Sequence, residues 1–116
     1  MNTGFEKLRV YAIAETLADQ VWKIVMSWDI FAKDTVGKQM TRAADGIGAN
    51  IAEGTGRGSF QDNRRFVKIA RGSLYETRHW LRSASSSHLS MNWVPSLTLT
   101  FALLERNRLQ HATKDK

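Results

Sequence analysis

The sequence predicts an all-α fold, and more specifically a bundle of four helices that forms a single domain over residues 1–116. Apolar residues recur at alternating spacings of three and four over long stretches, which is typical of helices packed in a bundle. Glycine-containing or serine-rich stretches separate these patterns, and 116 residues suit one domain. We expect helices at 5–31, 36–53, 59–85 and 92–110, with a disordered tail at 111–116.

The first expected helix has a regular heptad pattern, made of Val10, Ala14, Leu17, Val21, Ile24, Trp28 and Phe31. Tyr11 and Trp22 lie beside this seam and widen it, as happens when a helix packs against two neighbours. A turn is expected at 34–38, with Asp34 or Thr35 as the N-cap of the second helix.

The second expected helix has two different faces. Its core side is Met40, Ala43, Ala44, Ile47 and Ile51. Its other side carries Arg42, Gly46, Ala49 and Glu53. Gly46 and Gly48 each cost roughly 1 kcal/mol relative to alanine in a helix, so they indicate either close approach of another helix or a kink. Gly54 or Gly56 is expected to end the helix in a left-handed cap.

We hypothesise that this small-residue side is an oligomer contact. Glu53 lies at the C-terminal end of its helix, where the helix dipole disfavours an anion, so it needs a cationic partner or a capping role. Arg57 of the same chain or Arg42 of a neighbouring subunit can supply the cation. The expected interface is Arg42, Gly46, Ala49, Asn50, Glu53 and Arg57, with Asn50 hydrogen-bonded to a neighbouring backbone.

The third expected helix carries the clearest functional signal. Ser59 is the expected N-cap and Asp62 lies in the first turn, while the core seam is Phe66, Ala70, Ser73, Thr77, Trp80 and Ala84. On the opposite face, five cations and one aromatic follow the same spacing without an acid among them. This basic stripe is Arg64, Lys68, Arg71, Tyr75, Arg78 and Arg82. It indicates a polyanionic partner, although a charged face is also common on solvated helices.

The fourth expected helix starts near Asn92 with Pro95 in its first turn, and its apolar face is Leu97, Phe101, Leu104 and Leu109. Residues 96–101 also alternate apolar and polar as a strand does, but the bundle context favours a helix.

Charge is distributed unevenly along the chain. Residues 1–56 hold six Lys/Arg and seven Asp/Glu, whereas residues 57–116 hold eleven and four. The net charge of +6 therefore belongs to the second half, and it favours a nucleic acid over a membrane as partner.

Several classes of function are not indicated. The chain has no cysteine, no signal-peptide pattern and no apolar run of membrane-spanning length, so we expect a cytoplasmic bacterial protein. Glu76 and His79 have a metal-ligand spacing but lack the further inward-facing ligands that such a site needs. We expect no metal, no cofactor and no enzymatic activity.

One stretch also carries a family resemblance. The run Arg42-Ala43-Ala44, then residues 47–54, then Gly56-Arg57 and Ser59, resembles the small four-helix-bundle proteins encoded in intervening sequences of bacterial large-subunit ribosomal RNA. It is similar also to the accessory protein of diversity-generating retroelements. The likeness spans roughly residues 5–85 and includes Phe66, residues 69–70, 72–74 and Glu76. The resemblance implies an up-and-down four-helix bundle that assembles into a ring-like homo-oligomer, commonly a pentamer, and for most members it implies no known activity.

Two functions remain open at this point. The first is an oligomeric accessory protein whose basic stripe binds RNA, or less favoured DNA. The second is a structural or protein-interaction oligomer that docks an acidic protein partner on the same stripe.

Overall fold

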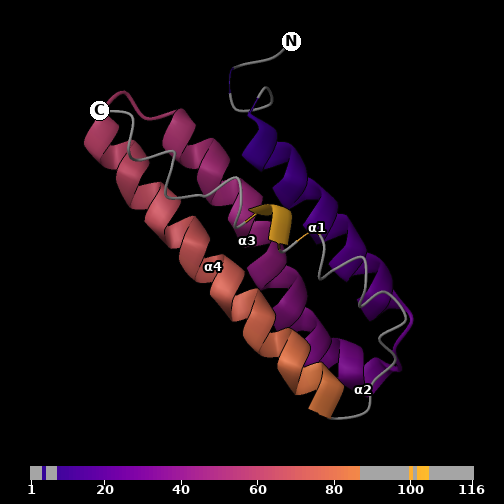
Figure 1. Cartoon of the computed structure of the whole chain (residues 1–116). Helices are drawn as coiled ribbons and strands as arrows, with labels where there is room; N and C mark the ends of the chain where they lie inside the picture. The colour runs from indigo at the N-terminus through magenta and orange to yellow at the C-terminus, as the bar shows by residue number, and fades with distance from the viewer. Residues whose placement is uncertain (1–3, 5–7, 87–99, 101, 105–116) are drawn as a thin grey trace.

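The computed structural model describes residues 4, 8–86, 100 and 102–104. This part of the chain is helical and contains no strand, which confirms the all-α class. Three long helical segments lie side by side: α1 (Arg9–Met26), α3 (Lys38–Thr55) with α2 (Ile30–Ala32) and the π-helical segment η2 (Lys33–Gly37) ahead of it, and α4 (Phe60–Ser86) (Figure 1).

Contacts at three glycines define the order of the helices. A Cβ atom at Gly48 would lie 3.4 Å from Tyr11 of α1, and one at Gly46 would lie 3.1 Å from the Ser73 hydroxyl of α4. A Cβ atom at Gly54 would lie 2.8 Å from Phe66. Helix α3 therefore packs against α1 on one side and against α4, in the antiparallel direction, on the other.

The buried core confirms most of the expected apolar positions. Ala14, Leu17, Val21, Ile24 and Trp28 are buried, as are all five core positions predicted for the second helix. Fully burying side chains such as Leu17, Ile24 or Ile47 stabilises the fold by about 1.5–3 kcal/mol each.

The first turn lies earlier than predicted. Helix α1 ends at Met26, and Asp29 caps the next helix by accepting a hydrogen bond from the backbone N–H of Ala32 at 2.9 Å. The expected cap Thr35 instead lies inside η2 and donates its hydroxyl to the carbonyl of Phe31 at 2.7 Å, while Asp34 is exposed in η2. The prediction of a helix through Phe31 and a turn at 34–38 is wrong, because Asp29 captures the free N–H group of a new helix start.

Two residues that the sequence pattern assigned to the core side of the first helix are exposed instead. Phe31 is 78% exposed instead of closing the seam of the first helix, and Trp22 is 55% exposed instead of widening it. Helix α3 extends to Thr55 and ends without a left-handed residue, since Gly56 has φ −77° and ψ −9°. Gly54 is buried within the helix, where the neighbouring α4 leaves no room for a side chain, so the expected left-handed cap is wrong as well.

The predicted fourth helix lies mostly outside the described residues. Thr100 and residues 102–104 are helical, which favours helix over strand for this piece. Leu104 is fully buried in the core, and the Thr100 hydroxyl donates to the side-chain carbonyl of Gln20 in α1 at 2.8 Å. In Figure 1 this short gold segment is drawn in front of α3. Residues 105–116, including the predicted tail, lie outside the described part.

Candidate nucleic-acid interface

Helix α4 carries the predicted basic stripe on a continuous scaffold of 27 residues. Its start is fixed by Ser59, whose side-chain oxygen accepts the backbone N–H of Asp62 at 3.1 Å, which confirms the predicted cap. Asp62 lies in the first turn, where a negative charge interacts favourably with the helix dipole.

The core side of α4 is rotated relative to the prediction. Its buried residues are Val67, Ala70, Leu74, Thr77 and Ala84. Phe66, Ser73 and Trp80, which were expected in the seam, are only half-buried, and Val67 and Leu74 take the central positions. On a helix with about 100° per residue, this places the basic stripe beside the core rather than directly opposite it.

The stripe residues are accessible in this arrangement. Arg64, Lys68, Tyr75, Arg78 and Arg82 are exposed, while Arg71 is half-buried because it borders the core side. Within the described residues, Arg64, Lys68, Arg71 and Arg82 form no ion pair. The structure therefore brings the six predicted residues onto one face of one helix, and within the described residues four of their five cations form no ion pair.

Phe66 has a role that the sequence pattern missed. The guanidinium carbons of Arg57 and Arg65 lie 4.9 Å and 4.5 Å from the centre of its ring, within range of cation–π attraction. The ring thus holds two cations at the end of α4 where the stripe begins. Two arginines near an aromatic residue in the sequence were the available signal, but Arg65 does not share the spacing of the stripe and Arg57 lies before the first residue of α4.

The expected oligomer face lies mainly on the outer side of α3. Arg42, Ala49 and Glu53 are exposed, and Asn50 and Gly46 are half-buried. The Asn50 side-chain amide donates to the carbonyl of Gly46 at 2.7 Å, so its hydrogen bond stays within the helix. The sequence allowed Glu53 to pair either with Arg57 of the same chain or with Arg42 of a neighbouring subunit. In the structure Glu53 forms an ion pair with Arg57 of the same chain at 2.8 Å.

The glycines of this face are explained within one chain. Gly46 permits the approach of Ser73 in α4 and Gly48 the approach of Tyr11 in α1, so close helix packing accounts for both without a kink. No contact between subunits is needed to offset their cost, and the oligomer interface stays a prediction that rests on the exposed residues.

The Glu76–His79 pair does not form a metal site in the described part of the chain, which holds no cluster of three potential ligands. Glu76 accepts a hydrogen bond from the indole N–H of Trp80 at 3.1 Å, and the exposed His79 ring packs edge-on against Trp80 with centres 4.8 Å apart. Both side chains are thus engaged in contacts along the surface of α4. No described helix has the length and apolar character required to cross a membrane.

The fold and this surface define a small all-helical protein with a cationic face on one long helix. The chain belongs to the 23S rRNA-intervening sequence protein family, whose profile matches residues 6–93. This match confirms the family resemblance drawn from the motif around residues 42–59. A comparison with curated proteins finds no match.

Proposed function

We propose that this protein is a non-enzymatic accessory protein that binds nucleic acid, with RNA favoured over DNA, through the basic stripe of α4. The main observation behind this proposal is the line of five cations from Arg64 to Arg82 on one unbroken helix, four of them exposed and Arg71 half-buried. At a rise of about 1.5 Å per residue this line is about 27 Å long, enough for several phosphates. Such contacts give strong, salt-dependent binding with little dependence on base sequence.

The family is described by its association with 23S rRNA intervening sequences, and this association is what favours RNA over DNA as the ligand. Tyr75, at 55% exposed, adds an aromatic surface in the middle of the stripe on which an unpaired base can stack. An acidic protein surface would use the arginines equally well, but it would make no use of a stacking platform.

We further propose that the protein forms a homo-oligomer, with a pentamer favoured, and that the exposed outer side of α3 is the contact between subunits. We also propose that residues 92–110 complete an up-and-down four-helix bundle. The buried Leu104 and the hydrogen bond from Thr100 to Gln20 support this completion, because these two residues, in the middle of that stretch, contact the core and α1.

RNA binding across a salt series tests the proposal. Replacing Arg64 and Lys68 with alanine is expected to weaken binding and to reduce the log–log salt slope by about 1.4, since each phosphate contact to a single strand contributes about 0.7. A matched control replaces Arg9 and Lys23, which are exposed on α1, and so removes the same charge elsewhere. Fluorescence anisotropy gives the affinity and light scattering the oligomer mass.

Equal losses in the two double variants would show that net charge, not the stripe, attracts the RNA. No binding at low salt by a correctly assembled protein would overturn the nucleic-acid proposal. Retained binding of an acidic protein in that case would support the alternative function.

A further inference from the structure

A cavity of about 420 Å³ lies between α1 and the helix that begins at α2. Trp22, Val25 and Met26 of α1 form its apolar wall, and Thr41 and Asp45 of α3 form the facing wall together with Gly37. Its volume is within the range of about 300–1,000 Å³ usual for small-molecule sites. None of these residues belongs to the basic stripe of α4.

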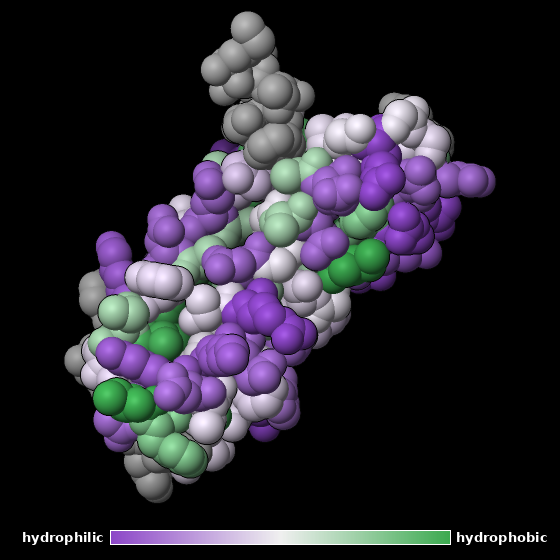
Figure 2. Space-filling model, turned by 180° about the vertical axis from the view of Figure 1, so that it is seen from behind, coloured by the Kyte–Doolittle hydropathy of each residue, from purple (hydrophilic) through white to green (hydrophobic). Residues whose placement is uncertain are grey.

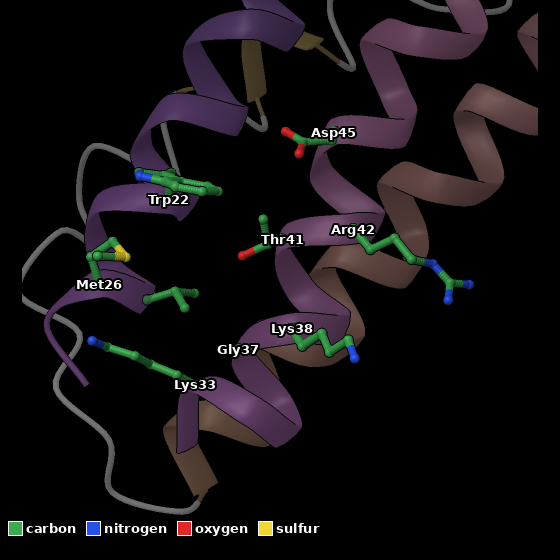
Figure 3. A pocket seen from close by; sticks show the side chains of 9 residues that line it. Trp22, Met26, Lys33, Gly37, Lys38, Thr41, Arg42 and Asp45 are labelled. Carbon is green, nitrogen blue, oxygen red and sulfur yellow. The ribbon is translucent and has the colours of Figure 1, made fainter. Parts of the chain in front are cut away.

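The apolar wall presents unusually accessible large side chains. Trp22 is 55% exposed and Met26 is 54% exposed, although both lie on a helix whose other face is deeply buried. Figure 3 shows the Trp22 ring reaching from α1 toward α3, with the Thr41 side chain directed into the space between the two helices. At the other end of the cavity the facing wall comes close to α1, since a Cβ at Gly37 would lie 2.7 Å from Val25.

Charged groups surround the cavity unequally. Lys33 extends along its lower side toward Met26, while the heads of Lys38 and Arg42 turn outward from its margin (Figure 3). Asp45 is the single acid in the lining, and burial together with the nearby Asp19 carboxylate raises the pKa of its carboxyl group above the ordinary value. Three cations at the cavity and its margin exceed the charge of Asp45 and the nearby Asp19, and this excess favours a ligand that carries negative charge.

We propose that this cavity binds one unpaired nucleotide of a single-stranded nucleic acid, with its base stacked on Trp22. A base has a flat apolar face that suits the indole, and a polar edge that suits the Thr41 hydroxyl and the Asp45 carboxylate. Its own phosphate lies within reach of Lys33, and the phosphates on either side follow the outward heads of Lys38 and Arg42. An apolar side chain of another protein would leave these three cations unused.

The inference rests on the proposed function for the identity of the ligand, but it concerns a different surface and predicts a different property. Phosphate contacts along α4 do not distinguish paired from unpaired strands, and within that stripe only Tyr75 offers a surface on which an unpaired base can stack. A base can enter the cavity only when it is unpaired. The cavity therefore adds a preference for single strands that depends on Trp22 and not on Tyr75.

The experiment measures anisotropy of a labelled single-stranded RNA of 12 nucleotides and of the corresponding duplex. Replacing Trp22 with alanine is expected to lower single-strand affinity about tenfold, since base stacking on an aromatic ring contributes about 1–3 kcal/mol, and to leave duplex affinity unchanged. Trp22→Phe, which keeps an aromatic face, is expected to restore most of the affinity. Phe31→Ala removes another exposed aromatic residue outside the cavity and is expected to change neither affinity.

If Trp22→Ala binds the single strand as tightly as the wild type, with its salt dependence intact, the cavity does not bind a nucleotide. That result would leave the proposal for α4 in place. Equal losses on single strand and duplex would overturn the cavity proposal too, because stacking cannot act on a paired base. A change in oligomer mass caused by Trp22→Ala would assign the cavity to a subunit contact and likewise contradict the inference. Absence of any RNA binding by the wild type would refute both proposals together.

Discussion

Glycine residues in this chain differ in what surrounds them, and the difference decides the effect of a substitution. Gly54 is buried in α3 against α4, where an added Cβ would lie 2.8 Å from both the Asn63 side-chain oxygen and the Phe66 Cβ. Gly72 lies in the middle of α4, where a Cβ added to it would have no atom within 4 Å apart from those of its chain neighbours and the adjacent helix backbone. Gly54 is therefore required by the packing of α3 against α4, whereas Gly72 only lowers the stability of its helix.

Gly54→Ala is expected to destabilise the protein by about 1–3 kcal/mol, because the backbone or Phe66 has to move to make room. Gly72→Ala is expected to stabilise it by about 0.5–1 kcal/mol, because alanine loses less backbone entropy in a helix and meets nothing there. Urea unfolding followed by circular dichroism measures both. Stabilisation by Gly54→Ala would show that α3 and α4 do not approach as closely as described.

Individual positions of α3 show what a sequence pattern can and cannot indicate. The spacing of Met40, Ala43, Ala44, Ile47 and Ile51 identified the buried side of α3 correctly, since one helix face determines burial. The glycines also correctly indicated close approach of another helix. Which helix approaches depends on tertiary packing, and the pattern alone could not show that Gly46 faces Ser73 of the same chain.

At the scale of the element, the boundary between the first two helices was the main error. The heptad pattern continues through Trp28 to Phe31, so hydrophobic spacing alone favours one long helix. Asp29 breaks it because its carboxylate accepts the N–H of Ala32 and begins a new helix, while Trp28 stays buried outside any helix. The signal was present as an N-cap residue inside an apolar stretch, but it competed with the stronger periodicity.

The Asp29 cap can be tested by substitution. Asp29→Ala is expected to lower the free energy of unfolding by about 0.5–2 kcal/mol, because the Ala32 N–H loses its side-chain acceptor. Asp29→Asn should retain most of the wild-type stability, since asparagine caps a helix nearly as well as aspartate. Thermal unfolding of the two variants beside the wild type gives the comparison. Equal destabilisation by alanine and asparagine would instead indicate that the negative charge, not the hydrogen bond, matters at this position.

At the scale of the whole molecule, the family, the all-α class and the helix that carries the stripe followed from the sequence. The stripe was identifiable because its spacing needs only a continuous helix, and α4 is continuous from Phe60 to Ser86. The cavity beside Trp22 was not identifiable, since it depends on how α1 faces η2 and α3 after an unexpected turn. Figure 2 shows, at the end of the molecule where α1 and α2 meet, the hydrophobic surface that this turn leaves exposed.

The oligomer hypothesis requires a variant that separates subunit contact from folding. Gly46→Leu is unsuitable, because a side chain there meets Ser73 within the same chain. Ala49 is exposed on the same face as Arg42, two turns earlier, and Glu53, one turn later, so a larger side chain at this position leaves the packing within the chain intact. Ala49→Arg is expected to reduce the oligomer mass measured by light scattering, because the added charge and bulk would be buried between subunits. Ala12→Arg, at an exposed position of α1, is the control and should leave the oligomer mass unchanged. Both variants should keep the helical circular dichroism spectrum of the wild type. An unchanged mass for Ala49→Arg would remove the outer side of α3 from the interface.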